Sequence, residues 1–315
     1  MKVLVFGLGA LGTVYSCLLK NRGHYVAGID NASVVETICC DGVKISGIWG
    51  EHEAQLDQVV VSLDELSEQD YDIIILSVKA YETAKVTQSL QPFIKTNSYL
   101  MLAQNGYGNY EAATQFINEA QVILGRVIFG AETINPGFSR VTVIADDVIL
   151  GSPKQLIDQQ VLEQFAAQFT EAGIPTRTST EIMKFIWGKI IYNSALNPLG
   201  AILEVNYGKL AEMESSQELM NQIFEEIFAV LSAAGQSTLW PDAKAYKKVF
   251  YEQLIPSTGG HHASMLQDIQ QGRHTEIDAL NGAVVRLGEQ HGIDTPVNRV
   301  ITALLKAKET MFLKS

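Results

Sequence analysis

The feature that most constrains this sequence is a glycine pattern directly after its first apolar run. Gly7, Gly9 and Gly12 follow KVLVF with the spacing G-x-G-x-x-G, and a second apolar run begins at Tyr25. This order is typical of the βαβ unit of dinucleotide-binding proteins: the glycines permit a tight turn, close approach of a pyrophosphate and close helix packing. The alternative is a glycine-rich turn without a ligand. The predicted cofactor loop consists of Gly7, Leu8, Gly9, Ala10, Leu11 and Gly12.

The identity of the cofactor depends on Asp30, at the end of the second apolar run. An acidic side chain at this point accepts hydrogen bonds from the ribose 2′-hydroxyl of NAD(H) and repels the 2′-phosphate of NADP(H). We therefore expect NAD(H). The alternative is that Asp30 is a turn residue or a helix N-cap, because Asp30-Asn31-Ala32-Ser33 also has the composition of a helix start.

The fold class follows from the alternation of apolar runs and amphipathic segments over the first 150 residues. This pattern is typical of α/β proteins with a doubly wound parallel sheet, and continuous apolar runs suit strands that are buried on both faces. We expect an antiparallel pair over residues 139–152, joined at Asp146-Asp147, then a helix over 156–172 and a short TRTST segment. Parallel strands are predicted at residues 2–7, 25–29, 71–78, 99–104 and 121–127.

The remainder of the chain shows helical periodicity only, from about Thr180 onward. We therefore expect a Rossmann-type domain over residues 1–178 and an all-helical domain over residues 179–315, which together enclose the substrate. Apolar residues in the helical part predict a homodimer interface or, alternatively, simply the domain core. They are Leu219, Ile223, Phe224, Ile227, Phe228 and Leu231.

The composition argues against several classes of binding partner. A formal charge of −12 opposes binding to nucleic acid and to anionic lipid, because both depend on Lys and Arg. The first apolar run is broken by glycines after six residues, unlike a signal peptide or a membrane span. The cysteines Cys17, Cys39 and Cys40 have neither disulfide-framework nor metal-site spacing. We expect a cytoplasmic protein with a small-molecule substrate and no metal.

A polar stripe marks the segment IWGKIIYNSALNPLG. Lys189, Asn193 and Asn197 recur every four residues, so they share one face of a helix whose other positions are mostly apolar. Asn is a mediocre helix former, which favours a bonding role over a solvated stripe, the alternative. Pro198 should end or kink this helix just after Asn197.

Further candidates lie in loops and in the segment from Ser264 to Gly282. Thr275 and Asp278 have the spacing of a capping box, which would give Glu276 the role of a charge in the first helical turn. Lys79 and Asn105 each follow a predicted strand, at the edge where open α/β sheets bind ligands, although each could be only a loop residue.

These groups suit the reduction of a 2-keto acid. That reaction needs a hydride for the carbonyl carbon, a proton for the developing alkoxide, and donors for the carboxylate. A lysine partly desolvated between two domains can supply the proton and also attract the anionic substrate. We therefore select Lys189 as the candidate acid.

The chain resembles the ketopantoate reductase (2-dehydropantoate 2-reductase) family over nearly its whole length. The resemblance rests on GLGALG, SVKA, QNGYG, K-x-x-x-N-x-x-x-N-P-L, SMLQD and TEID-x-x-N-G, which occur in this order. It implies a Rossmann-type domain followed by a helical domain, and an NAD(P)H-dependent oxidoreductase. Members of the family convert 2-dehydropantoate to pantoate for pantothenate and coenzyme A synthesis.

The resemblance also implies individual roles. Lys189 would be the general acid, and Glu276 the acidic partner that orients the substrate or the lysine. Ser264 would bind the substrate carboxylate. The remaining matches are Asn193 and Asn197 as hydrogen-bond partners of the substrate, and Lys79 and Asn105 where nicotinamide, cofactor phosphates and substrate meet.

The sequence departs from the family pattern at two positions. Asp30-Asn31 stands where many members carry a basic residue for NADP(H), the cofactor typical of the family. His261 stands where the family often has an asparagine that contacts the substrate. An NAD-dependent D-2-hydroxyacid dehydrogenase for mandelate-like or branched-chain acids is therefore an alternative. A non-catalytic dinucleotide sensor is a third, but it has no need of the lysine and asparagine stripe.

Overall fold

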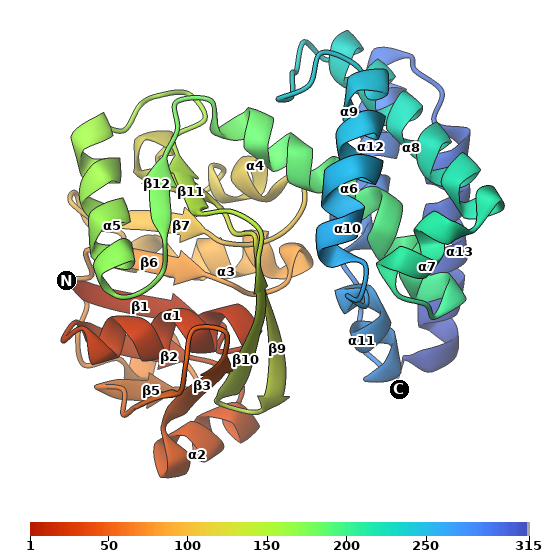
Figure 1. Cartoon of the computed structure of the whole chain (residues 1–315). Coiled ribbons are helices and arrows are strands. Elements are labelled where there is room, and N and C mark those ends of the chain that lie inside the picture. The colour runs from red at the N-terminus through yellow and green to blue at the C-terminus, as the bar shows by residue number, and fades with distance from the viewer. Residues whose placement is uncertain (314–315) are drawn as a thin grey trace. The chain divides into compact units, whose positions relative to one another are not determined.

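The computed structural model describes residues 1–313, which form two compact units. We call the first, comprising Met1–Gln104 and Asn109–Ile182, the sheet unit. We call the second, comprising Asn105–Gly108 and the described chain from Met183 onward, the helical unit. Strands and helices alternate in the first, whereas the second consists of helices (Figure 1).

A mostly parallel sheet forms the centre of the sheet unit. Within residues 1–182 its strand order is β12-β11-β8-β7-β6-β1-β2-β5, and β11 is antiparallel to β8. The part β5-β2-β1-β6-β7-β8 has the 3-2-1-4-5-6 order of dinucleotide-binding sheets, whose order reverses between β1 and β6. The strands are β1 (Lys2–Phe6), β2 (Tyr25–Ile29), β5 (Gln58–Val60), β6 (Ile73–Leu76), β7 (Tyr99–Leu102), β8 (Val122–Arg126), β11 (Val148–Gly151) and β12 (Thr176–Thr178).

The predicted fold class is confirmed, because the five predicted parallel strands are β1, β2, β6, β7 and β8. Their apolar runs are buried on both faces, as at Val3, Ile74 and Met101. The helices of this unit are α1 (Ala10–Asn21), α2 (Ala32–Asp41), α3 (Thr83–Leu90), α4 (Asn109–Ala113) and α5 (Gln159–Glu171), with 3-10 turns η1 (Leu63–Glu65), η2 (Ala80–Glu82), η3 (Gln91–Phe93) and η4 (Glu119–Gln121).

The predicted antiparallel pair over residues 139–152 is wrong. Its first run, β10 (Phe138–Ile144), belongs to a separate small sheet with β9 (Phe129–Asn135), β3 (Val43–Gly47) and β4 (His52–Ala54). Its second run, β11, pairs with β8 and β12 in the main sheet. The reason is at the predicted turn, where Asp146 forms ion pairs with Arg126 and Arg177 of the main sheet. The two runs therefore diverge instead of folding back on each other.

The helical unit is built around the long helix α6 (Ile182–Leu203). Its core contains Trp187, Ile191, Phe224 and Tyr246, which are fully buried. The other elements are α7 (Tyr207–Glu212), α8 (Glu214–Ala233), α9 (Ala243–Val249), a π-helical turn η5 (Phe250–Leu254), α10 (Ile255–Thr258), α11 (Ser264–Gln270), η6 (Ile277–Ala279), α12 (Asn281–His291) and α13 (Pro296–Phe312).

One expectation for this unit is corrected, and one alternative is supported. Pro198 does not end α6, which continues to Leu203, because the carbonyl that loses its helical donor receives one from Asn281. Of the six apolar residues considered for a dimer interface, Ile223, Phe224, Ile227 and Leu231 are at most 2% exposed and lie in the core, as the alternative expected, whereas Leu219 is 37% exposed.

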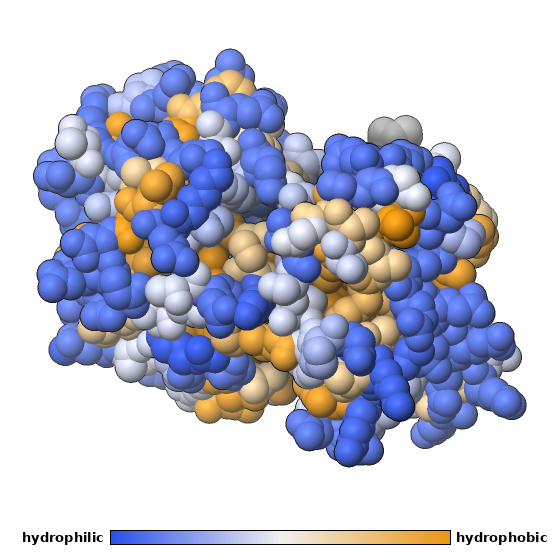
Figure 2. Space-filling model, turned by 90° about the horizontal axis from the view of Figure 1, so that it is seen from above, coloured by the Kyte–Doolittle hydropathy of each residue, from blue (hydrophilic) through white to orange (hydrophobic). Residues whose placement is uncertain are grey.

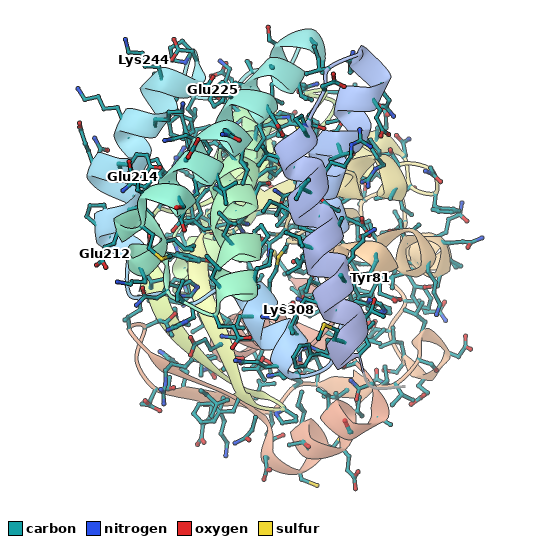
Figure 3. All side chains as sticks on the ribbon, turned by 90° about the vertical axis from the view of Figure 1, so that its right-hand side faces the viewer. Tyr81, Glu212, Glu214, Glu225, Lys244 and Lys308 are labelled. Atoms are coloured by element: carbon teal, nitrogen blue, oxygen red, sulfur yellow. The ribbon has the colours of Figure 1, made fainter. Side chains whose placement is uncertain are left out.

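The end of α6 is anchored by the last helix. Lys308 of α13, labelled in Figure 3, donates from Nζ to the carbonyl oxygen of Ala201 at 2.8 Å and to the Glu204 carboxylate at 2.7 Å. Glu204 has a φ of 59°, the left-handed conformation in which helices often terminate. The lysine satisfies carbonyl oxygens that the ended helix leaves without donors.

The surface is largely polar. Hydrophilic residues cover most of the face in Figure 2, with smaller hydrophobic areas between them, which agrees with the acidic composition. Among residues 1–313 no helix is both long and apolar enough to cross a membrane. The same residues contain no group of three or more His, Cys, Asp or Glu side chains placed to hold a metal ion.

Candidate active site

The glycine loop has the geometry that its sequence predicts. Gly7 has a φ of 95°, which favours glycine, and its N–H donates to the Ile29 carbonyl at 2.9 Å. A Cβ on Gly12 would lie 1.8 Å from the Gly7 carbonyl oxygen, so α1 can approach β1 only with glycine there. A Cβ on Gly9 would meet nothing within 4 Å. This open space lies at the N terminus of α1, the position at which dinucleotide-binding folds hold a pyrophosphate.

A serine that the sequence analysis missed supports this loop. Ser77, directly after β6, donates from Oγ to the Gly7 carbonyl oxygen at 2.7 Å. It belongs to the SVKA string, in which only Lys79 was predicted to have a role. Lys79 lies two residues further on, half-buried, at the start of η2. The loops after β1 and β6 therefore meet where the strand order reverses, the usual ligand position in such sheets.

Asp30 points at the glycine loop. One carboxylate oxygen accepts from the Leu8 N–H at 2.5 Å, and the other accepts from the Asn31 backbone and side-chain N–H groups at 2.7 Å each. The N-cap of α2 is Asn31, whose side chain accepts from Val34 N–H. The alternative that Asp30 is the helix cap is therefore wrong. Its half-buried carboxylate lies where a cofactor ribose would be recognised.

The polar stripe on α6 is present as predicted on a mostly buried helix. Lys189 is half-buried, while Asn193 and Asn197 are 8% and 5% exposed. The remainder of the helix packs into the core through residues such as Trp187 and Ile190. A solvated stripe would have left the two asparagines exposed, so that alternative is wrong.

Asn105 and Glu276 are brought together within the helical unit. Asn105 Nδ2 donates to a carboxylate oxygen of Glu276 at 3.2 Å. The segment is fixed by Tyr107, whose N–H donates to the Ala279 carbonyl at 2.8 Å and whose ring stacks on Trp187 at 5.0 Å. Gly106, with a φ of 89°, passes so close to Ala279 that a Cβ would lie 2.5 Å from its carbonyl oxygen.

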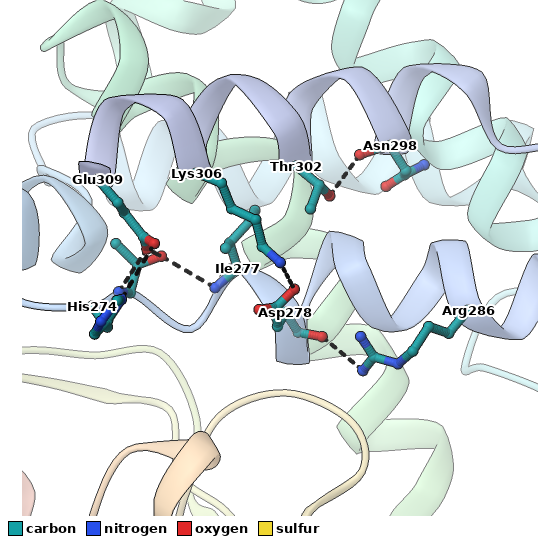
Figure 4. Close-up of polar contacts among 9 residues, drawn as sticks. His274, Ile277, Asp278, Arg286, Asn298, Thr302, Lys306 and Glu309 are labelled. Carbon is teal, nitrogen blue, oxygen red and sulfur yellow. Dashed lines mark hydrogen bonds and ion pairs between the residues drawn. The ribbon is translucent and has the colours of Figure 1, made fainter. Parts of the chain in front are cut away.

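The predicted capping box is confirmed only in part: Thr275 Oγ1 accepts from the Ile277 N–H at 3.3 Å, but the Thr275 N–H donates to Glu309 and not to Asp278. Thr275 donates from its backbone N–H and its hydroxyl to the buried carboxylate of Glu309 on α13. Asp278 instead forms an ion pair with Lys306 at 2.7 Å (Figure 4). The Glu276 side chain makes no capping bond to η6. Because Glu276 occupies the N-cap position of η6, its charge still lies at a helix start, as the alternative expected.

The two remaining candidates are His261, in the loop between α10 and α11, and Ser264, at the start of α11. Ser264 is the exposed first residue of α11. The carbonyl oxygen of His261 accepts from Tyr207 N–H at 3.0 Å, and Tyr207 in turn donates from its hydroxyl to Asn197. His262 lies nearby in a pocket of about 530 Å³ that contains none of the predicted site residues. Val205, Asn206, Gly208, Lys209, Glu212, Gly259, Gly260 and His262 line it.

Solved structures resemble the chain over its full length. A ternary structure of D-mandelate dehydrogenase with NADH and anilino(oxo)acetate has a TM-score of 0.89 at 28% identity and covers 100% of both chains. A PanE/ApbA family ketopantoate reductase from Ralstonia eutropha JMP134 has a TM-score of 0.86 at 28% identity and covers 99% of both. Fold and site together define an oxidoreductase that uses a nicotinamide dinucleotide.

Sequence comparison identifies the family. The models "Ketopantoate reductase PanE/ApbA" and "Ketopantoate reductase PanE/ApbA C terminal" match residues 3–155 and 181–309. A 2-dehydropantoate 2-reductase from Aquifex aeolicus is 48% identical, covering 100% of this chain and 99% of the relative. One from Pyrococcus abyssi is 31% identical, covering 99% of both. The chain belongs to the ketopantoate reductase family, and the predicted resemblance is confirmed.

Proposed function

We propose that this protein reduces 2-dehydropantoate to pantoate, with a nicotinamide dinucleotide as the hydride donor. The proposal is supported by the 48% identity to a 2-dehydropantoate 2-reductase over the full chain. The structural observation that carries it is the stripe of Lys189, Asn193 and Asn197 on a buried helix. The same unit holds the bonded pair of Asn105 and Glu276. A protein that only sensed a dinucleotide would need neither group.

The sheet unit binds the cofactor in this proposal. The amides at the start of α1 bind the pyrophosphate in the open space before Gly9, and Lys79 binds a cofactor phosphate. Asp30 binds the ribose hydroxyls. Because its carboxylate is already held by Leu8 N–H beside the loop, a 2′-phosphate there would meet a fixed negative charge. NAD(H) is therefore the preferred cofactor, although NADP(H) is typical of the family.

The helical unit supplies the proton and orients the keto acid. When bound, the reduced nicotinamide provides the hydride that adds to the C2 carbonyl carbon. The carbonyl oxygen then carries a developing negative charge and takes a proton from the Lys189 ammonium. Asn193 and Asn197 donate hydrogen bonds to the substrate, and Ser264 binds its carboxylate. Glu276, held by Asn105 at 3.2 Å, orients the lysine or the substrate hydroxyl.

Two observations favour a second function. His261 stands where the family often has asparagine, and D-mandelate dehydrogenase with NADH has the same fold over the whole chain. An imidazole at this position would change the contacts of the substrate side chain. The second candidate is therefore an NAD-dependent D-2-hydroxyacid dehydrogenase for mandelate-like or branched-chain acids.

Initial rates of cofactor oxidation distinguish the two functions. 2-Dehydropantoate, benzoylformate and 2-ketoisocaproate are each compared with NADH and with NADPH. We expect the highest kcat/KM for 2-dehydropantoate. A preference for benzoylformate or 2-ketoisocaproate would support the dehydrogenase instead, and failure to reduce any 2-keto acid despite NADH binding would support a sensor.

We also propose a cytoplasmic location, supported by three cysteines that form no disulfide.

A further inference from the structure

A buried tyrosine connects the polar stripe of α6 to the loop that carries His261. Tyr207 is the first residue of α7 and is 3% exposed. Its hydroxyl donates to Asn197 Oδ1 at 2.5 Å, while its backbone N–H donates to the His261 carbonyl at 3.0 Å. Gly208 N–H donates to the Gly259 carbonyl at 2.8 Å. One residue therefore contacts two parts of the proposed substrate site.

The ring of Tyr207 is held on two sides. Tyr192 packs edge-on against it with ring centres 6.0 Å apart, and the His261 ring packs edge-on at 5.3 Å. Burial raises the pKa of Tyr207 far above its usual range, so the phenol stays protonated. The phenol keeps its proton and donates it to the Asn197 oxygen.

A carboxamide has two ends of similar size and opposite hydrogen-bonding character. Its oxygen only accepts, whereas its nitrogen donates two hydrogen bonds. The carbonyl and carboxylate oxygens of a 2-keto acid need donors, so only one of the two amide orientations is useful to them. With Asn197 Oδ1 bonded to the tyrosine, Nδ2 is the end that can donate to the substrate.

We propose that Tyr207 is a positioning residue that fixes the Asn197 amide with Nδ2 as the donor to the substrate. This inference rests on the proposed function, in which Asn197 binds the keto acid. Tyr207 acts only through Asn197. The Gly259 to His261 loop sets its position, because Tyr207 and Gly208 bond to the backbone of that loop.

A double-mutant cycle tests this role. Tyr207→Phe removes only the hydroxyl, and its effect is measured in the wild type and in Asn197→Ala by steady-state kinetics with 2-dehydropantoate. In the wild type we expect KM for the keto acid to rise about tenfold, the size of one lost hydrogen bond, with a much smaller change in kcat and an unchanged Kd for the cofactor. In Asn197→Ala we expect no further effect.

A neighbouring tyrosine provides the matched control. Tyr192 also lies in the helical unit, and its hydroxyl donates to Thr258 Oγ1 at 2.6 Å rather than to the stripe. Tyr192→Phe removes the same atom from a partly buried ring that packs against Tyr207, so it should leave KM for the keto acid within twofold of the wild type. An equal rise in KM in both tyrosine variants would mean that packing, not Asn197, is responsible, and would overturn the proposal.

A second substitution tests the donor itself and does not depend on the tyrosine variant. Asn197→Asp retains an oxygen for Tyr207 but has no N–H, so KM should rise at least as much as in Asn197→Ala. If Asn197→Asp keeps the wild-type KM, the amide is not a donor and the proposal is wrong. If Tyr207→Phe raises KM for the keto acid as much in Asn197→Ala as in the wild type, the positioning role is wrong while the reductase function stands. If Asn197→Ala leaves KM for the keto acid unchanged, both the substrate role of Asn197 and the positioning role of Tyr207 are wrong.

Discussion

Asn281 donates from Nδ2 to the carbonyl oxygen of Ser194 at 2.9 Å, which replaces the helical bond that Pro198 cannot make. Asn281 is completely buried, and it also donates to Asn298 Oδ1 at 3.0 Å. Asn298 in turn donates to the carboxylate of Glu226 at 2.7 Å. This network joins α6, α8, α12 and α13, and it lets α6 continue past its proline.

Replacing Asn281 should therefore destabilise the helical unit. Asn281→Ala leaves the buried Ser194 carbonyl without a donor, which should lower the free energy of unfolding by about 2 kcal/mol. Urea denaturation followed by circular dichroism measures it. Pro198→Ala restores an N–H at the right place in the helix, so in the Asn281→Ala background it should recover part of the loss. No recovery would mean that the destabilisation comes from Asn298 or from packing.

Much of the fold could be predicted because its signals are local. The strands β1, β2, β6, β7 and β8 are continuous apolar runs, and the glycine spacing identifies the first turn. The small sheet could not be predicted in this way. Its strand β3 pairs with β10, about 95 residues further along the chain, and no local pattern encodes that partner.

In the candidate site, too, local patterns could be predicted from the sequence and contacts between distant segments could not. The four-residue spacing of Lys189, Asn193 and Asn197 was sufficient to place them on one helix face. The bond between Asn105 and Glu276 joins distant segments, and only the assembled unit shows it. Tyr207 had no signal at all, since a single aromatic residue outside any periodic pattern predicts no role. The capping box was predicted only in part, because Glu309, remote in sequence, accepts from the Thr275 N–H, while Asp278 pairs with Lys306.

Two glycine substitutions should separate cofactor binding from folding. Gly9 has a φ of −69°, which alanine tolerates, and its Cβ would enter open space. Gly9→Ala should therefore melt like the wild type but raise the Kd for NADH about tenfold or more, because the methyl group occupies the pyrophosphate position. Gly12→Ala should lower the melting temperature, since its Cβ collides with the Gly7 carbonyl. Wild-type NADH affinity in Gly9→Ala would contradict the assignment of the phosphate site.

Asp30 should control the choice between the two cofactors. Asp30→Asn keeps an oxygen for Leu8 N–H but removes the charge, so the ratio of kcat/KM for NADPH to that for NADH should rise about tenfold. Asp57→Asn is the control, because it removes the same charge from a carboxylate that accepts from Val26 N–H and pairs with Lys20. It should leave the ratio unchanged. A preference of the unaltered protein for NADPH would mean that Asp30 does not select NAD(H).

Lys189 should be required for proton transfer and not for cofactor binding. Lys189→Ala should lower kcat by about 10²- to 10⁴-fold and leave the Kd for NADH unchanged. Lys189→Arg keeps the positive charge but is a poor proton donor, so it should retain more substrate affinity than alanine while kcat stays low. Lys209→Ala, at an exposed lysine paired with Glu212, is the control. A normal kcat in Lys189→Arg would assign this residue the role of a cation alone.

Glu276 should be needed for activity and not for stability. Its side chain makes no capping bond to η6, and the segment is held instead by Thr275 on Glu309. Glu276→Gln should therefore melt like the wild type while losing both kcat and affinity for the keto acid, because the charge that orients the lysine or substrate is gone. Thr275→Val, in contrast, should lower the melting temperature by a few degrees, because the variant loses the hydrogen bond from the Thr275 hydroxyl to Glu309. If Glu276→Gln has a lowered melting temperature but a normal kcat, the charge of Glu276 serves stability and not catalysis.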